Sequence, residues 1–107
     1  MNTLNESAAD AVLVSAKASF YKHSERLQDL LGEFGYPGAT VERLDEAWLA
    51  ALGMQQQAIN ILNYLIDSGG DDTDLWKRRV LTAGSRATAL QAARDALKIV
   101  LLPPSAR

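Results

Sequence analysis

His23 is the only histidine of the chain, and its position makes it the first residue to consider for chemistry. Between residues 6 and 34 apolar residues recur every seven positions, and His23 falls where this repeat would place an apolar residue. Gln55 interrupts the next apolar pattern in the same way. Pairing the two segments about a turn near Tyr36 brings His23 opposite Gln55 and Gln56. We therefore predict a polar core pair of His23 with Gln55, or with the adjacent Gln56.

Two interpretations of this pair stand side by side. In the first, it fixes the register of two packed helices, as buried polar residues do in helical bundles. In the second, His23 and Gln55 line a pocket for a small molecule, in an enzyme subunit or a binding protein. A metal site is disfavoured, because no carboxylate stands one helical turn from His23 and the chain has no cysteine. We favour the structural interpretation.

Three carboxylates, Glu42, Asp45 and Glu46, cluster at the start of the second apolar segment. Acidic side chains there interact favourably with the positive end of a helix dipole, so the cluster needs no catalytic explanation. A carboxylate-bridged metal centre would need a Glu-x-x-His spacing, which the sequence lacks. It also lacks a nucleophile with its base and a glycine-rich phosphate loop. We predict no catalytic residue, no cofactor, no metal and no enzyme activity.

Charge is distributed unevenly about the Gly69-Gly70 loop. Residues 1–72 carry four basic and eleven acidic groups, a balance of −7, whereas residues 73–107 carry seven basic and two acidic groups, a balance of +5. The basic C-terminal segment can therefore contact the acidic part of the chain itself or bind an anionic partner.

Lys77, Arg78 and Arg79 stand near the start of the third segment, where cations are disfavoured by the helix dipole. Neighbouring aspartates, or the acidic first two segments, can offset this effect. The alternative is a surface for an anionic partner such as nucleic acid, to which Arg86, Arg94 and Lys98 would contribute. Because no helix-turn-helix and no interleaved aromatic residues support the alternative, local compensation is the interpretation that we favour.

Apolar residues recur at steps of three, four or seven positions, the period that keeps side chains on one side of a helix. No segment alternates β-branched and aromatic residues with polar ones, as a strand would. The pattern predicts three helices, over residues 6–34, 40–67 and 73–102. Since short connections force antiparallel neighbours, we predict one all-α domain over residues 1–107, an up-down-up bundle of three long helices.

Local signals set the expected helix ends. Thr40 can cap the second helix by accepting a hydrogen bond from a first-turn amide, and Gly69 suits the left-handed backbone that follows a helix. Asp72 or Thr73 can cap the third helix, and Pro103 and Pro104 stop it. Gly84, which is followed by serine, weakens the third helix, so a kink or a short break there is an alternative to a continuous helix.

Apolar and tyrosine side chains exceed what three helices would cover, because several of them lie off or beside the main stripes. We expect a further helix to cover this surplus, from an identical copy or from another protein, so that oligomerisation completes the bundle. The predicted interface residues are Val12, Val14, Tyr21, Leu31, Ile61 and Tyr64.

No apolar run approaches the roughly 18 residues of a membrane span, and the first residues lack the basic group of a signal peptide. We expect a cytoplasmic protein without a membrane partner.

These observations rank three functions. First is a non-catalytic interaction module, an adaptor, chaperone or assembly component that self-associates or binds a partner helix. Second is a small nucleic-acid-associated regulator that uses the basic third segment through Lys77, Arg78, Arg79 and Arg86. Third is an enzyme subunit or small-molecule binder with a pocket around His23 and Gln55.

Overall fold

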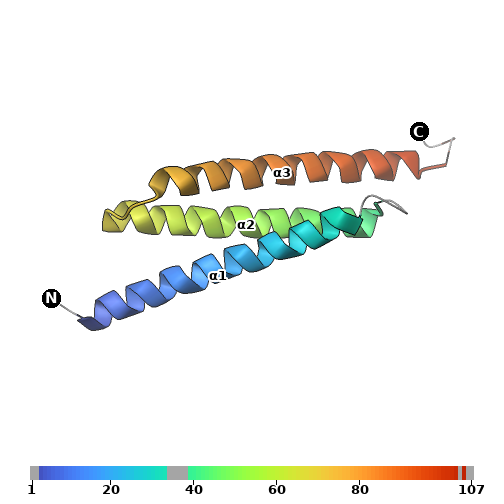
Figure 1. Ribbon diagram of the computed structural model, residues 1–107. Coiled ribbons are helices and arrows are strands. Elements are labelled where there is room, and N and C mark those ends of the chain that lie inside the picture. Colours follow the sequence, from blue (N-terminus) through green and yellow to red (C-terminus); the bar gives the residue numbers. More distant parts are fainter. Residues whose placement is uncertain (1–2, 34–38, 104, 106–107) are drawn as a thin grey trace.

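The computed structural model describes residues 3–33, 39–103 and 105, with the side chains of residues 3–10 and 33 left aside. Three helices follow one another: α1 (Thr3–Glu33), α2 (Val41–Ser68) and α3 (Thr73–Val100), drawn in Figure 1. The described residues contain no strand, so the expectation of an all-α fold is confirmed. None of the three helices holds, within the described residues, an apolar stretch that would carry it through a lipid bilayer.

The ends of α2 follow from local chemistry. Thr40 has an extended backbone, and its hydroxyl Oγ1 accepts a hydrogen bond from the amide of Arg43 at 3.1 Å. At the other end Gly69 has a φ of 68°, and the amide of Gly70 donates to the carbonyl of Leu65 at 2.8 Å. These are the N-cap and the left-handed C-cap that stabilise isolated helix ends.

The start of α3 is capped in a different way from the start of α2. Asp72 is the N-cap residue, but its φ is 68° and its side chain accepts no cap hydrogen bond. The first turn of α3 therefore lacks the side-chain cap that the sequence favours at this position.

α3 runs as one unbroken helix through Gly84, so the break considered there does not occur (Figure 1). The glycine instead allows close packing: a Cβ at this position would lie 2.7 Å from Nε2 of Gln55 on α2. The hydroxyl of Thr88 donates to the carbonyl of Gly84 at 3.0 Å, one turn further along α3.

α2 lies between the two other helices and packs against both (Figure 1). Its contacts with α3 run in opposite order along the two helices: Asp45 lies beside Arg94, and Gln55, further along α2, lies beside the earlier Gly84 of α3. No Cα atom of α1 lies within 8 Å of a Cα atom of α3 in the part of the chain described. The outer helices therefore meet only through side chains, and the molecule is an elongated body with extents of 68 × 20 × 18 Å.

Small side chains on α2 let the neighbouring helices approach. Ala47, Ala51 and Ala58 are fully buried, whereas larger apolar groups from α1 and α3 fill the space between them. The rings of Phe20 and Trp76 meet edge to face, with centroids 5.1 Å apart, and so join α1 to α3 across α2. The other buried apolar residues are Leu27, Leu30, Leu44, Ala50, Met54, Ile61, Leu65, Ala83, Ala87 and Leu90.

Ile61 corrects one prediction. It was expected at an interface, but none of its surface is exposed, and it lies with Ala58 and Leu65 on the core face of α2. Its spacing of three and four positions from these residues explains the burial, because such residues share one side of a helix.

Candidate functional site

The structure does not bring His23 and Gln55 together. His23 packs against Gly53 of α2, where a Cβ would lie 2.7 Å from its Nε2 atom, and Gln55 packs against Gly84 of α3. Neither side chain is buried, and no hydrogen bond joins the two among the described residues. Gln56 donates instead to Asn60 on its own helix at 3.0 Å. The two residues therefore occupy different helix–helix contacts, His23 between α1 and α2 and Gln55 between α2 and α3.

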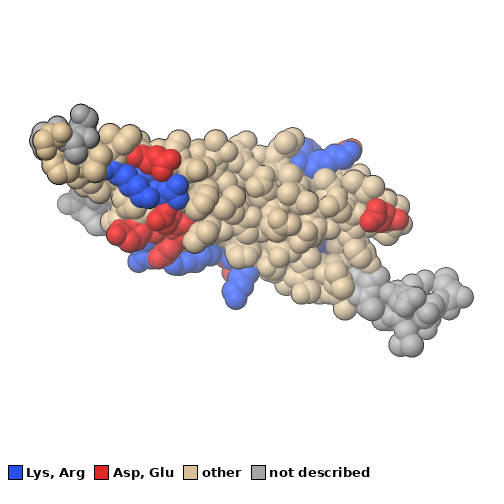
Figure 2. All heavy atoms as spheres, turned by 180° about the vertical axis from the view of Figure 1, so that it is seen from behind, with Lys and Arg blue, Asp and Glu red and all other residues tan. Residues whose placement is uncertain are grey.

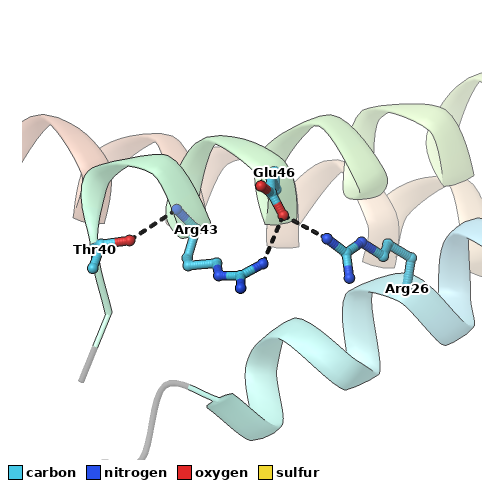
Figure 3. A network of polar contacts seen from close by, with 4 residues as sticks. All are labelled: Arg26, Thr40, Arg43 and Glu46. Atoms are coloured by element: carbon cyan, nitrogen blue, oxygen red, sulfur yellow. Dashed lines mark hydrogen bonds and ion pairs between the residues drawn. The ribbon is translucent and has the colours of Figure 1, made fainter. Parts of the chain in front are cut away.

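Two carboxylates near the start of α2 form ion pairs with arginines of the neighbouring helices. Glu46 Oε2 accepts from Arg26 of α1 and from Arg43 of α2, the second at 3.2 Å, and Figure 3 shows both arginines pointing at this oxygen. Asp45 Oδ1 accepts from Arg94 of α3 at 2.9 Å. No cluster of three histidine, cysteine, aspartate or glutamate side chains with metal-binding geometry occurs in the part of the chain that the structure covers.

Arg94 is a structural arginine. Its guanidinium carbon lies 4.6 Å from the centroid of the Trp48 ring, and only 13% of its side chain is exposed. Its hydrogen bond to Asp45 raises the pKa of Arg94, and a second bond to Asp95 acts in the same direction. This arginine is fully engaged within the fold and offers little to a partner.

Arg79 is the centre of the contact between α1 and α3. Its guanidinium carbon lies 4.5 Å from the centroid of the Trp76 ring and 5.5 Å from those of Phe20 and Tyr21. Its Nη1 atom donates to the hydroxyl of Tyr21 at 3.0 Å. Cation–π contacts and this hydrogen bond together fix the position of the cation on an aromatic base.

A groove runs beside this contact, between α1 and α3. Its first part has a volume of about 430 Å³ and combines an apolar floor with cationic and hydroxyl groups. A second part, of about 230 Å³, shares Arg86 with the first and is otherwise apolar. We call the two parts together the arginine groove. Its lining residues used below are Phe20, Tyr21, Ser24, Leu27, Leu31, Met54, Leu75, Arg78, Arg79, Arg86, Ala89 and Leu90.

Four cations of α3, one of them Lys98, have no partner among the described residues. Lys77, Arg78 and Arg86 are exposed and form no hydrogen bond or ion pair with any residue in the described ranges. Local compensation by the aspartates before α3 is therefore not seen as direct ion pairing. Arg78 and Arg86 lie in the arginine groove, and Lys77 lies outside it.

The third face of α2 carries a stripe that sequence reasoning missed. Its six residues follow one another at steps of three and four: Leu49, Leu52, Gln56, Ile59, Asn63 and Ile66. Leu49 is 59% exposed and Ile66 is 54% exposed, while Leu52 and Ile59 are half-buried. Apolar periodicity predicts Leu52, Ile59 and Ile66 as part of the core stripe and does not include Leu49. We call these six residues the α2 stripe.

No charged residue occurs between Glu46 and Asp67, so the α2 stripe is free of charge along its length. Figure 2 shows the molecule from behind, with a broad area in the middle that carries no lysine, arginine, aspartate or glutamate. A long uncharged stretch within a helix is the sequence signal by which this face could have been found.

The predicted interface residues do not form one surface. Tyr21 and Leu31 line the two parts of the arginine groove, whereas Val12 lies in a separate hollow between α1 and α2. Val12, Val14, Tyr21 and Leu31 are exposed, and Tyr64 is half-buried.

A scan against protein-family models, a search of curated proteins and a search of solved structures found no match.

Proposed function

We propose that the protein is a non-catalytic helical interaction module that self-associates through the α2 stripe. The observation that carries this proposal is the second heptad-like row on α2, which is uncharged, apolar at four of its six positions and exposed at both of its ends. Residues spaced by three and four positions form the seam of helix pairs. A second copy would cover this row and complete the up-down-up bundle as part of a larger helical assembly.

Polar residues of the α2 stripe favour parallel pairing of two copies. In a parallel pair each position meets its own equivalent, so Gln56 meets Gln56 and Asn63 meets Asn63. In an antiparallel pair centred on the stripe, Asn63 would meet Leu52, and its amide would lose water without gaining a partner. The absence of charge along the stripe also removes the like-charge repulsion that would oppose symmetric pairing.

Sedimentation equilibrium tests the proposal. We expect a dimer at micromolar concentration for the natural chain and a monomer for the double variant Leu49→Lys/Ile66→Lys, which places charges at both ends of the stripe. Both positions are more than half exposed, so circular dichroism should report an unchanged helix content.

Leu81→Lys is the matched control, because Leu81 is 70% exposed on α3 and lies outside the stripe. The mass of this variant in sedimentation equilibrium should show the same oligomeric state as the natural chain. A natural chain that stays monomeric up to about 100 μM, a range in which specific dimers form, would rule out self-association through this face.

Nucleic-acid binding by α3 is the second candidate. The unpaired state of Lys77, Arg78 and Arg86 among the described residues supports it, since such cations can neutralise phosphates. We rank it lower because the arginines lie beside apolar side chains that a phosphate backbone does not use. Retention of a 20-nucleotide single strand only at low salt would speak against a specific complex. The cytoplasmic location expected from the sequence stays a prediction.

A further inference from the structure

We infer that the arginine groove binds one acidic amphipathic helix from another protein, with its apolar side on the groove floor and its carboxylates against Arg78, Arg79 and Arg86. This inference rests on the proposed function, because it names a partner for the interaction module. It adds a second surface, separate from the α2 stripe.

The groove has the dimensions of a helix site. From Leu75 to Leu90 it follows α3 over a separation of fifteen positions, which at about 1.5 Å per residue is about 22 Å, or about four helical turns. On the facing helix it extends from Phe20 to Leu31. Because the backbones of α1 and α3 stay more than 8 Å apart, side chains of α2 such as Met54 reach the floor.

The floor selects apolar side chains. Phe20, Met54, Leu27 and Leu90 are buried in its base, and Leu31 is 43% exposed at its edge. An amphipathic helix that lays leucine or a similar residue along this row would remove the remaining apolar area from water.

The cationic side selects carboxylates. Arg79 is held by the rings of Phe20, Tyr21 and Trp76 and donates one hydrogen bond to the Tyr21 hydroxyl. Because a guanidinium has five N–H donors, others stay available for a ligand. Arg78 and Arg86 stand eight positions apart on α3, a separation of about 12 Å. Carboxylates seven or eight positions apart on the bound helix would therefore face both arginines, and arginine–carboxylate pairs can be bidentate.

Other occupants fit less well. The α2 stripe of a second copy offers no carboxylate, so it would leave these arginines unpaired. A nucleic acid would pair with the arginines but would gain nothing from the leucine-lined second part of the groove. An acidic helix uses both halves of the groove.

Two synthetic helices test the inference directly. Both are 16-residue peptides with leucine at heptad core positions; one carries glutamate beside the leucines, and the other carries lysine at the same positions. Fluorescence anisotropy at about 150 mM salt, where charge screening over long distances is strong, should give at least tenfold tighter binding of the glutamate peptide to the natural chain. In nuclear magnetic resonance spectra, the amides of Ser24, Leu31 and Ala89 should shift on addition of this peptide.

Charge reversal supplies the stricter arm. The double variant Arg78→Glu/Arg86→Glu should bind the glutamate peptide at least tenfold more weakly than the natural chain does, and it should bind the lysine peptide more tightly. The matched control Lys77→Glu/Lys98→Glu makes the same change in net charge at two exposed positions on α3 outside the groove, and it should retain the natural preference. Equal losses in both double variants would show a general charge effect and overturn the inference.

Further outcomes separate this inference from self-association. A dimer that binds neither peptide would overturn the groove proposal and leave self-association intact. A monomer that binds the glutamate peptide would overturn self-association and leave the groove proposal intact. The chain could instead bind a 20-nucleotide single strand more tightly than the glutamate peptide and lose this binding in Arg78→Glu/Arg86→Glu. That result would assign the groove to nucleic acid and overturn the proposal that it binds an acidic helix.

Discussion

At the residue scale, two glycines decide how closely the helices pack. Gly53 receives the ring of His23 from α1, and Gly84 receives the amide of Gln55 from α2. The sequence showed both polar interruptions but suggested that they meet each other. Each is instead matched by a missing side chain on the opposite helix. A spacing argument places His23 near residues 52–56, but it does not reveal which side of α2 faces α1.

The two glycines should respond differently to alanine. At Gly53 a Cβ would lie within 2.8 Å of three atoms of the His23 ring, a rigid group, so Gly53→Ala should lower the free energy of unfolding by about 1 to 3 kcal/mol. At Gly84 the Cβ meets the flexible end of Gln55, which can turn away. Gly84→Ala should therefore leave stability unchanged or raise it by up to about 1 kcal/mol, the gain in helix propensity.

Urea unfolding at one fixed protein concentration measures both glycine variants. Gly53→Ala/His23→Ala is the control for the mechanism, since removal of the ring should restore most of the loss. Equal destabilisation by both single variants would contradict the distinction between a rigid and a flexible neighbour.

At the element scale, helix ends were predictable and helix faces were not. Thr40 and Gly69 act through hydrogen bonds to residues a few positions away, so their signals are local and appear in the sequence. The faces of α2 depend on where two other helices lie. α2 carries apolar residues on its core face and again along the α2 stripe. Periodicity alone assigned Leu52, Ile59 and Ile66 of the stripe to the core and placed Ile61 of the core face outside it.

The caps of α2 and α3 provide a prediction at this scale. Thr40→Ala removes the bond to the Arg43 amide and should lower the free energy of unfolding by about 1 kcal/mol, whereas Thr40→Ser should retain most of it. Asp72 makes no side-chain cap bond and has a φ of 68°, a conformation that glycine adopts without strain. Asp72→Gly should therefore not reduce stability. Thermal unfolding followed by circular dichroism would test this, and a larger loss at Asp72 than at Thr40 would contradict it.

At the scale of the whole molecule, the helix order and the all-α class were within reach of the sequence, but the open arrangement was not. A compact triangular bundle would have brought the backbones of α1 and α3 together. The arginine groove exists because they stay apart and meet through Phe20, Trp76 and Arg79. Large aromatic side chains between the outer helices and alanines on α2 together produce this geometry, which apolar periodicity does not encode.

Self-association gives a prediction at this same scale. If two copies pair in parallel along the α2 stripe, Asn63→Ile replaces a polar layer by an apolar one and should tighten the dimer by at least tenfold. Asn63 is exposed in the single chain, so monomer stability should change little. Gln91→Ile, which makes the same change from a polar to an apolar side chain at an exposed position of α3 outside the stripe, is the control. Sedimentation equilibrium would measure both, and an unchanged association constant for Asn63→Ile would contradict parallel pairing.

The location of Met54 relative to the α2 stripe has a consequence for any assembly. Met54 lines the arginine groove, and at about 100° per residue it points away from Leu49, Gln56 and Asn63 on the opposite side of the same helix. Two copies joined back to back would therefore turn their grooves outward. Such a pair would be a bivalent connector, able to hold two ligands apart and to gain avidity for any target that repeats its acidic helix.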